Sequence, residues 1–96
     1  MDNAENEQKF EPAVGALLRA SRLRVGEDLR DIAAVLRIRY PYLEAIEEGR
    51  YQDLPGITYA VGFVRTYAEH LGLDADEVVR RFKSENESIK RRSDLV

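Results

Sequence analysis

The sequence contains no cysteine and no tryptophan, and it has a single histidine among its 96 residues. Without cysteine there is no disulfide framework, no thiolate metal site and no thiol nucleophile. One histidine leaves few ligands from which a zinc site could be built. No uninterrupted apolar run approaches the roughly 18–20 residues that a membrane-spanning helix needs, and the N-terminus is too acidic for a signal peptide. The expected class is therefore one soluble cytoplasmic domain.

The charges are unevenly distributed along the chain, although the net charge is only −3. Residues 1–12 are acidic and carry few large apolar side chains, so we expect a disordered lead-in. Residues 13–84 contain the regular apolar pattern of a folded domain. Residues 85–96 are polar and aperiodic and include a cationic run. We expect them to form a basic linker.

Apolar residues recur at helical spacing through the central region, and no segment alternates with a period of two over a useful length. Five helices are predicted, which begin near residues 14, 28, 40, 58 and 74 and end near residues 25, 36, 49, 71 and 84. Gly26 and Gly49 suit left-handed C-caps, and Pro41 suits a first helical turn. Thr58 and Asp74 are predicted N-caps.

The second and third predicted helices are joined only by Leu36-Arg37-Ile38-Arg39. Two short helices with so short a connection are typical of a helix-turn-helix, although other small helical bundles share this spacing. Arg37 occupies the turn, where glycine is usual. The predicted fold is all-α: a five-helix, repressor-like (Xre/lambda-repressor-like) helix-turn-helix domain. The positions that such a pair buries are apolar: Ile32, Ala33, Leu36, Ile38, Leu43 and Ile46.

The predicted recognition helix, residues 40–48, argues against DNA binding. Such a helix must present hydrogen-bond donors to base edges while it lies among phosphates. Its groove-facing positions hold no Arg, Lys, Asn or Gln; they are Tyr40, Pro41, Tyr42, Glu44, Glu47 and Glu48. The nearby arginines either contact a nucleic-acid backbone or pair with Glu44, Glu47 and Asp28. DNA is not the expected partner, and a repressor-like transcriptional regulator is kept as the alternative function.

Catalytic chemistry has little support in the sequence. No Ser, His and Asp residues cluster by spacing, and there is no glycine-rich phosphate loop. His70 falls near the predicted end of the fourth helix, where an imidazolium interacts favourably with the helix dipole. We expect no enzymatic activity, no cofactor and no metal.

The fourth predicted helix has two distinct faces. At about 100° per residue its core side carries Ala60, Val64, Tyr67 and Leu71. A neighbouring face carries Tyr59, Gly62, Phe63, Thr66 and His70. Aromatic residues dominate interface energetics, and an interior glycine costs a helix about 1 kcal/mol, so this face is a candidate protein-docking patch. Its two aromatic residues would show the same pattern if they only covered the preceding loop.

Three segments together resemble the N-terminal cytoplasmic domain of the RodZ family of bacterial cell-shape proteins: LRASRLRVGEDLRDIAAVLRI, YLEAIEEGRYQ and LPGITYAVGFVRTYAEHLGLD. The resemblance covers about residues 14–82, and its second half is the more specific. It implies a helix-turn-helix that has become a protein adaptor. RodZ proteins are single-pass inner-membrane proteins whose cytoplasmic domain binds the actin-like filament protein MreB and links it to the wall-elongation machinery.

The resemblance also implies a contact site. In the family, MreB is contacted largely by the fourth helix and its approach, whose aromatic positions match Tyr59, Phe63 and Tyr67 here. Helical-wheel arithmetic puts Tyr67 nearer the core than the other two. Tyr51 and Thr66 are predicted to belong to the same site.

A membrane link is implied as well. In the family the domain precedes a membrane span by a linker, and Lys90, Arg91 and Arg92 would lie on its cytoplasmic side. There they either contact anionic lipid or form an ordinary solvated tail. Because the span itself is absent, we expect a fragment of a longer protein at the cytoplasmic face of the inner membrane, with an intact stand-alone protein as the alternative. The domain is expected to be monomeric.

Overall fold

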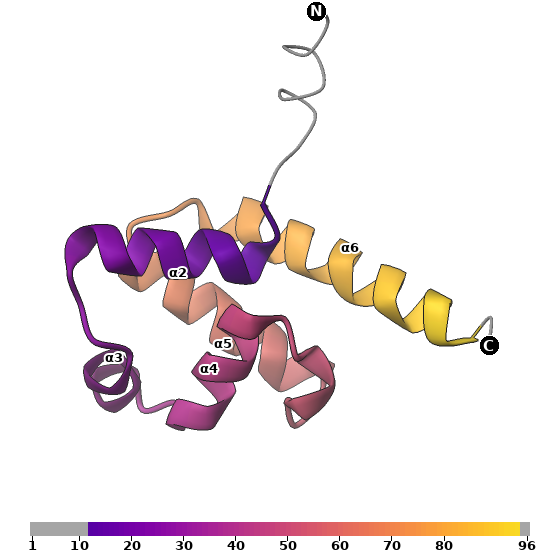
Figure 1. The fold of residues 1–96 in the computed structure, drawn as a ribbon, viewed down its shortest axis with the longest axis horizontal. Helices are drawn as coiled ribbons and strands as arrows, with labels where there is room; N and C mark the ends of the chain where they lie inside the picture. The colour runs from indigo at the N-terminus through magenta and orange to yellow at the C-terminus, as the bar shows by residue number, and fades with distance from the viewer. Residues whose placement is uncertain (1–11, 95–96) are drawn as a thin grey trace, which may run out of the picture.

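A computed structural model describes residues 12–94, with side chains described up to residue 89. The elements in chain order are α2 (Val14–Val25), α3 (Leu29–Leu36), α4 (Tyr40–Glu48), the short 3-10 helix η1 (Tyr51–Asp53), α5 (Ile57–His70) and α6 (Ala75–Asp94) (Figure 1). Every regular element in this part of the chain is helical, which confirms the predicted all-α fold. The predicted acidic lead-in lies outside the described residues, apart from Pro12.

The predicted C-cap glycines have the expected backbone conformation. Gly26 after α2 has φ 77° and Gly49 after α4 has φ 75°, both in the left-handed region that glycine adopts without a steric penalty. Asp28 caps α3, because its carboxylate accepts a hydrogen bond of 2.7 Å from the amide of Arg30. These caps place α2, α3 and α4 where the sequence predicted them.

The predicted cap of α5 is wrong. The helix begins at Ile57, so Thr58 lies inside the first turn, and the N-cap position belongs to Gly56 without any side-chain cap hydrogen bond. The predicted cap of α6 is confirmed, because the carboxylate of Asp74 accepts a hydrogen bond of 3.2 Å from the amide of Glu77.

The turn between α3 and α4 depends on a residue in an unfavourable backbone conformation. Arg37 has φ 59° and ψ 40°, and it is the one non-glycine residue with positive φ in the described chain. Such a left-handed residue costs about 1–2 kcal/mol. The conformation lets the amide of Ile38 donate to the carbonyl of Ala33 at 3.1 Å, which closes α3 and turns Ile38 into the core. The turn thus accommodates arginine in a left-handed conformation that glycine would adopt without a steric penalty.

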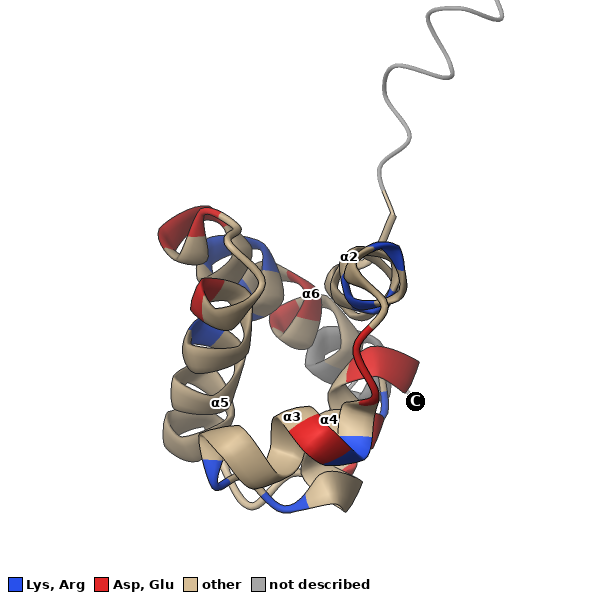
Figure 2. Cartoon of the chain, turned by 90° about the vertical axis from the view of Figure 1, so that its left-hand side faces the viewer, with Lys and Arg blue, Asp and Glu red and all other residues tan. Residues whose placement is uncertain are grey.

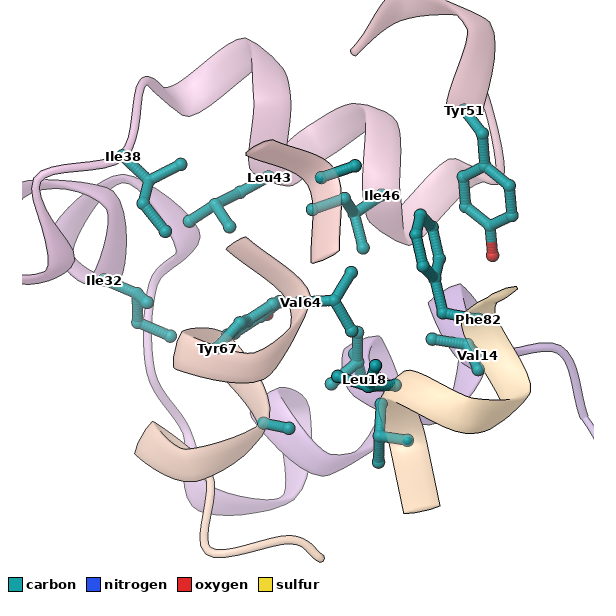
Figure 3. Packing of buried hydrophobic residues seen from close by; sticks show 14 of the residues in the cluster. Val14, Leu18, Ile32, Ile38, Leu43, Ile46, Tyr51, Val64, Tyr67 and Phe82 are labelled. Atoms are coloured by element: carbon teal, nitrogen blue, oxygen red, sulfur yellow. The ribbon is translucent and has the colours of Figure 1, made fainter. Parts of the chain in front are cut away.

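The core lies between the five α-helices of the described chain. Figure 3 shows side chains from α2, α4, α5 and α6 converging on one another. The largest fully buried side chains are Tyr67, Phe82, Leu18, Ile32, Leu43, Ile46, Val14 and Val64. Helix α5 packs along α6, while α4 packs against both α2 and α3.

Helix α6 continues well past the predicted domain boundary at residue 84. It runs to Asp94 and projects away from the body in Figure 1. Glu85 belongs to the folded body, because its carboxylate accepts hydrogen bonds from the amide of Val14 at 3.0 Å and the hydroxyl of Tyr51 at 2.9 Å. The expectation of an aperiodic linker from residue 85 is therefore corrected: the linker region begins as helix.

Gly15 permits a close approach between α2 and α4. A methyl group at this position would lie 2.3 Å from the carbonyl oxygen of Ile46 and 2.6 Å from that of Glu47. Both atoms belong to the backbone of α4, which cannot rotate away as a side chain would. The second helical glycine, Gly62, faces open space with no atom within 4 Å of an added methyl.

These two glycines predict opposite effects of the same substitution. We expect Gly15→Ala to destabilise the domain by about 2–3 kcal/mol, because α2 must move away from α4. Gly62→Ala should stabilise it by about 1 kcal/mol through helix propensity. The measurement is the free energy of unfolding in urea for both variants and the wild type. Two changes of the same sign would contradict the packing described here.

Candidate functional site: an exposed aromatic face on α5

Three of the five predicted site residues lie on the outer side of α5. Tyr59 is 64% exposed, Thr66 is exposed and Phe63 is half-buried. Their spacing of four and three residues places them along one side of the helix. Ala60 and Val64, on the opposite side, are buried in the core. The division of α5 into two faces therefore follows the predicted pattern.

The exposed aromatic residues form a short ladder with a ring from α4. The rings of Tyr42 and Phe63 are stacked, with centroids 5.6 Å apart and an interplanar angle of 15°. The ring of Tyr59 lies 6.4 Å from that of Phe63. We call Tyr42, Tyr59 and Phe63 the aromatic face. The sequence predicted Tyr42 on the groove-facing side of the recognition helix and not as part of this site. No local pattern indicates that its side chain packs against a helix some twenty residues later.

Two predicted site residues are core residues instead. Tyr67 has no exposed surface, and its hydroxyl donates to Glu47. Tyr51 is 7% exposed and packs edge-on against Phe82, with ring centroids 4.7 Å apart. Neither ring is available to a partner in this structure. The predictions for Tyr51 and Tyr67 as contact residues are therefore wrong.

A nearly buried ion pair and a tyrosine hydroxyl together join α2, α4 and α5. The guanidinium of Arg22 on α2 donates two hydrogen bonds to the carboxylate of Glu47 on α4, at 2.8 and 3.0 Å. The two side chains are only 12% and 5% exposed, and the hydroxyl of Tyr67 on α5 donates to the same carboxylate. Hydrogen bonding to Glu47 raises the pKa of Arg22 above its ordinary value. Glu47 therefore points into the body, which corrects its predicted place on the groove-facing side of α4.

The rest of the outer side of α4 is engaged with its neighbours. The guanidinium of Arg30 lies 4.1 Å from the ring centroid of Tyr40, and the Tyr40 hydroxyl donates to Glu44 at 3.3 Å. Arg50 pairs with Glu48 at 3.0 Å. Figure 2 shows acidic and basic segments interleaved around α3 and α4. A groove of about 360 Å³ between α2, α3 and α4 has both charge signs in its lining, so this side offers no continuous cationic surface to phosphates.

The described residues 12–94 contain neither a membrane-spanning helix nor a cluster of metal ligands. Across this range no helix is both long and apolar enough to cross a bilayer. The described side chains also include no group of three or more acidic or histidine residues placed to hold a metal ion.

The two buried tyrosines predict a pH dependence of stability. Burial raises the pKa of both the Tyr51 and the Tyr67 phenol. An unfolded tyrosine loses its proton near pH 10, whereas these folded phenols keep theirs. Stability should thus be unaffected by them below about pH 10 and fall above it, by up to about 1.4 kcal/mol per pH unit for each tyrosine. The free energy of unfolding in urea, measured between about pH 8 and 11, should fall less steeply for the double variant Tyr51→Phe/Tyr67→Phe than for the wild type. Equal slopes for the two proteins would contradict this prediction.

Comparison with known proteins agrees with the helix-turn-helix geometry. Residues 17–78 match the family model described as "Helix-turn-helix domain". The chain is 42% identical over 57 residues to "Uncharacterized membrane protein YmfM" of Bacillus subtilis (strain 168), a match that covers 59% of this chain but only 20% of that protein. No solved structure matches the chain. Because the family model covers more than half of its length, the chain belongs to the helix-turn-helix domain family.

Proposed function

We propose that this domain is a protein adaptor that docks onto an actin-like filament of the MreB type through its aromatic face. The observation that carries the proposal is the exposure of Tyr59, which is 64% accessible beside a ring pair that α4 and α5 hold in place. Exposed rigid aromatic side chains are the residues that most often dominate protein–protein binding energy. The proposal assigns no catalytic activity and no cofactor to the domain.

The side chains of the aromatic face are held in place by packing against α4 and by the buried side of α5, which favours binding. Phe63 is held by its stack on Tyr42, and the inner side of α5 is fixed by the buried residues Val64 and Tyr67. A partner would therefore not have to order these rings on binding, and less conformational entropy is lost. Thr66 and Gly62 are exposed beside the rings, so a partner can approach α5 closely at this point.

The proposal places the domain at the cytoplasmic face of the inner membrane, as a monomeric part of a longer cell-shape protein. Two observations support this setting: the resemblance to RodZ and the match to a relative that is named a membrane protein. Helix α6 leads out of the body toward Lys90, Arg91 and Arg92, whose side chains lie outside the described ones. Each would contribute about 1 kcal/mol if it met an anionic lipid surface.

A DNA-binding regulator is disfavoured by the same geometry. The recognition helix of a repressor must leave its outer side free for base edges and phosphates. Here Tyr40 is engaged by Arg30 and Glu44, and Glu48 adds an exposed carboxylate, paired with Arg50, to the same helix. Because α5 is not the element that a helix-turn-helix inserts into the groove, its aromatic face would have no role in DNA binding.

Co-sedimentation with polymerised MreB tests the proposal. Tyr59→Ala and Phe63→Ala should each weaken binding by about tenfold or more, as expected for residues at the centre of an interface. Leu23→Ala is the matched control, because Leu23 is an apolar side chain of α2 with 57% exposure that lies outside the aromatic face. Unchanged binding by both folded variants would contradict the site. Absence of pelleting, with retention on DNA that weakens steeply with salt, would favour the regulator instead.

Gly62 provides a variant whose stability and binding should change in opposite directions. We expect Gly62→Leu to raise the free energy of unfolding by about 1 kcal/mol, because leucine favours the helix and its Cβ atom would have no other atom within 4 Å. The same side chain would stand beside Tyr59 and Phe63 and obstruct a partner's approach. Urea unfolding and co-sedimentation on one preparation measure both effects. A stabilised variant that still binds as the wild type does would show that the partner does not contact this part of α5.

A further inference from the structure

The outer side of α5 leads into a second surface feature at its C-terminal end. A groove of about 310 Å³ lies between the α2–α3 turn, α3 and His70. Two apolar side chains, Ile32 and Val35, contribute to its lining together with three carboxylates. The carboxylates are Glu27, Asp28 and Asp31.

Val35 has no role in the core of the domain. It is 68% exposed, the largest value among the exposed large apolar residues of the described chain. On the same helix, Leu29 and Ile32 are buried, so the inner side of α3 is already complete without it. A single exposed valine needs no explanation by itself. Val35, however, lines a groove, where it would contact a bound group.

The carboxylates of the groove differ in what they already bind. Glu27 pairs with His70 at 2.8 Å, which ties the α2–α3 turn to the end of α5. Asp28 is engaged as the N-cap of α3. Asp31 is exposed and makes no hydrogen bond or ion pair within the described part of the chain. The Glu27–His70 pair therefore links two sides of the groove, and Asp31 leaves one carboxylate without a partner among the described residues, in the same lining as the exposed Val35.

The groove and the aromatic face share one side of α5. Tyr59, Phe63, Thr66 and His70 follow one another at spacings of four, three and four residues, which keeps them on one stripe. Eleven residues of helix correspond to about 16 Å along the axis. A single partner surface of ordinary size can cover this distance, since a specific interface buries about 800 Å² on each partner.

We propose that the groove is the second half of the docking surface and receives a cationic segment of the same filament partner. This inference rests on the proposed function. A lysine or arginine of the partner pairs with Asp31, and an apolar side chain next to it covers Val35. The negative charge of the lining selects this chemistry and disfavours phosphate groups, because like charges across an interface oppose binding. The aromatic face then supplies affinity, while the groove fixes the direction in which the partner lies.

Co-sedimentation with polymerised MreB at about 50 and 300 mM salt tests the inference with three variants. Asp31→Lys should weaken binding at low salt by about fivefold or more, and the difference should shrink at high salt. Val35→Ser should weaken binding by about three- to tenfold at both concentrations. Asp76→Lys is the control, since it makes the same charge change in the first turn of α6 and should bind as the wild type does. Because it also removes the 2.7 Å ion pair between Asp76 and Arg65, urea unfolding first establishes that this variant is folded.

The outcomes separate this inference from the proposed function. If Tyr59→Ala abolishes binding while Asp31→Lys and Val35→Ser bind as the wild type does, the aromatic face acts alone and the groove has no part. If the wild type itself does not pellet, the proposed function fails and this inference fails with it. Analytical ultracentrifugation adds a further check, because a wild-type dimer that Asp31→Lys dissociates would assign the groove to a second copy of the chain and overturn the inference.

Discussion

The arrangement of the domain depends on one carboxylate inside it. Glu47 accepts hydrogen bonds from Arg22 and Tyr67, and so links α4 to α2 and α5 at a point where only 5% of the Glu47 side chain is exposed. Removing one partner of such a pair typically costs 3–5 kcal/mol, because a buried charge remains uncompensated. No buried side-chain polar atom among the described residues lacks a partner. We infer that this network sets the relative positions of the three helices more than it adds net stability.

The consequence is a helix-turn-helix whose recognition helix is largely used for internal contacts. Glu47 points inward, Tyr42 stacks on α5, and Tyr40 lies between Arg30 and Glu44. The outer side of α5 remains exposed, and the buried Tyr67 holds the inner side of the same helix in the core. A fold does not determine its function, and the protein partner that we propose rests on these exposed side chains and not on the helix-turn-helix itself.

The sequence predicted the helices well because their boundaries are set by local chemistry. Glycines in left-handed conformations and the Asp28 cap act within a few residues, so pattern alone can find them. The long-range contacts were anticipated only in part. Pairing of a nearby arginine with Glu47 was one of two alternatives, and the Arg22–Glu47 pair confirms it, but the sequence did not show that this carboxylate is almost buried. Nothing near Glu85 indicates that it bonds to the start of α2. For Tyr67 the helical wheel already indicated the core, and the carry-over from the RodZ resemblance overrode it. Tyr51 had no such signal, because it lies in a short 3-10 helix.

The central claim is that a partner filament lies directly on the outer side of α5, and site-specific photo-crosslinking measures this most directly. A photoreactive phenylalanine analogue would replace Tyr59 in one sample and Leu23 in the other, two exposed positions on different helices. In the presence of polymerised MreB, the account predicts a covalent adduct between the two proteins from position 59 and none from position 23. Adducts from position 23 alone, or from neither position while the domain still pellets with the filament, would contradict it.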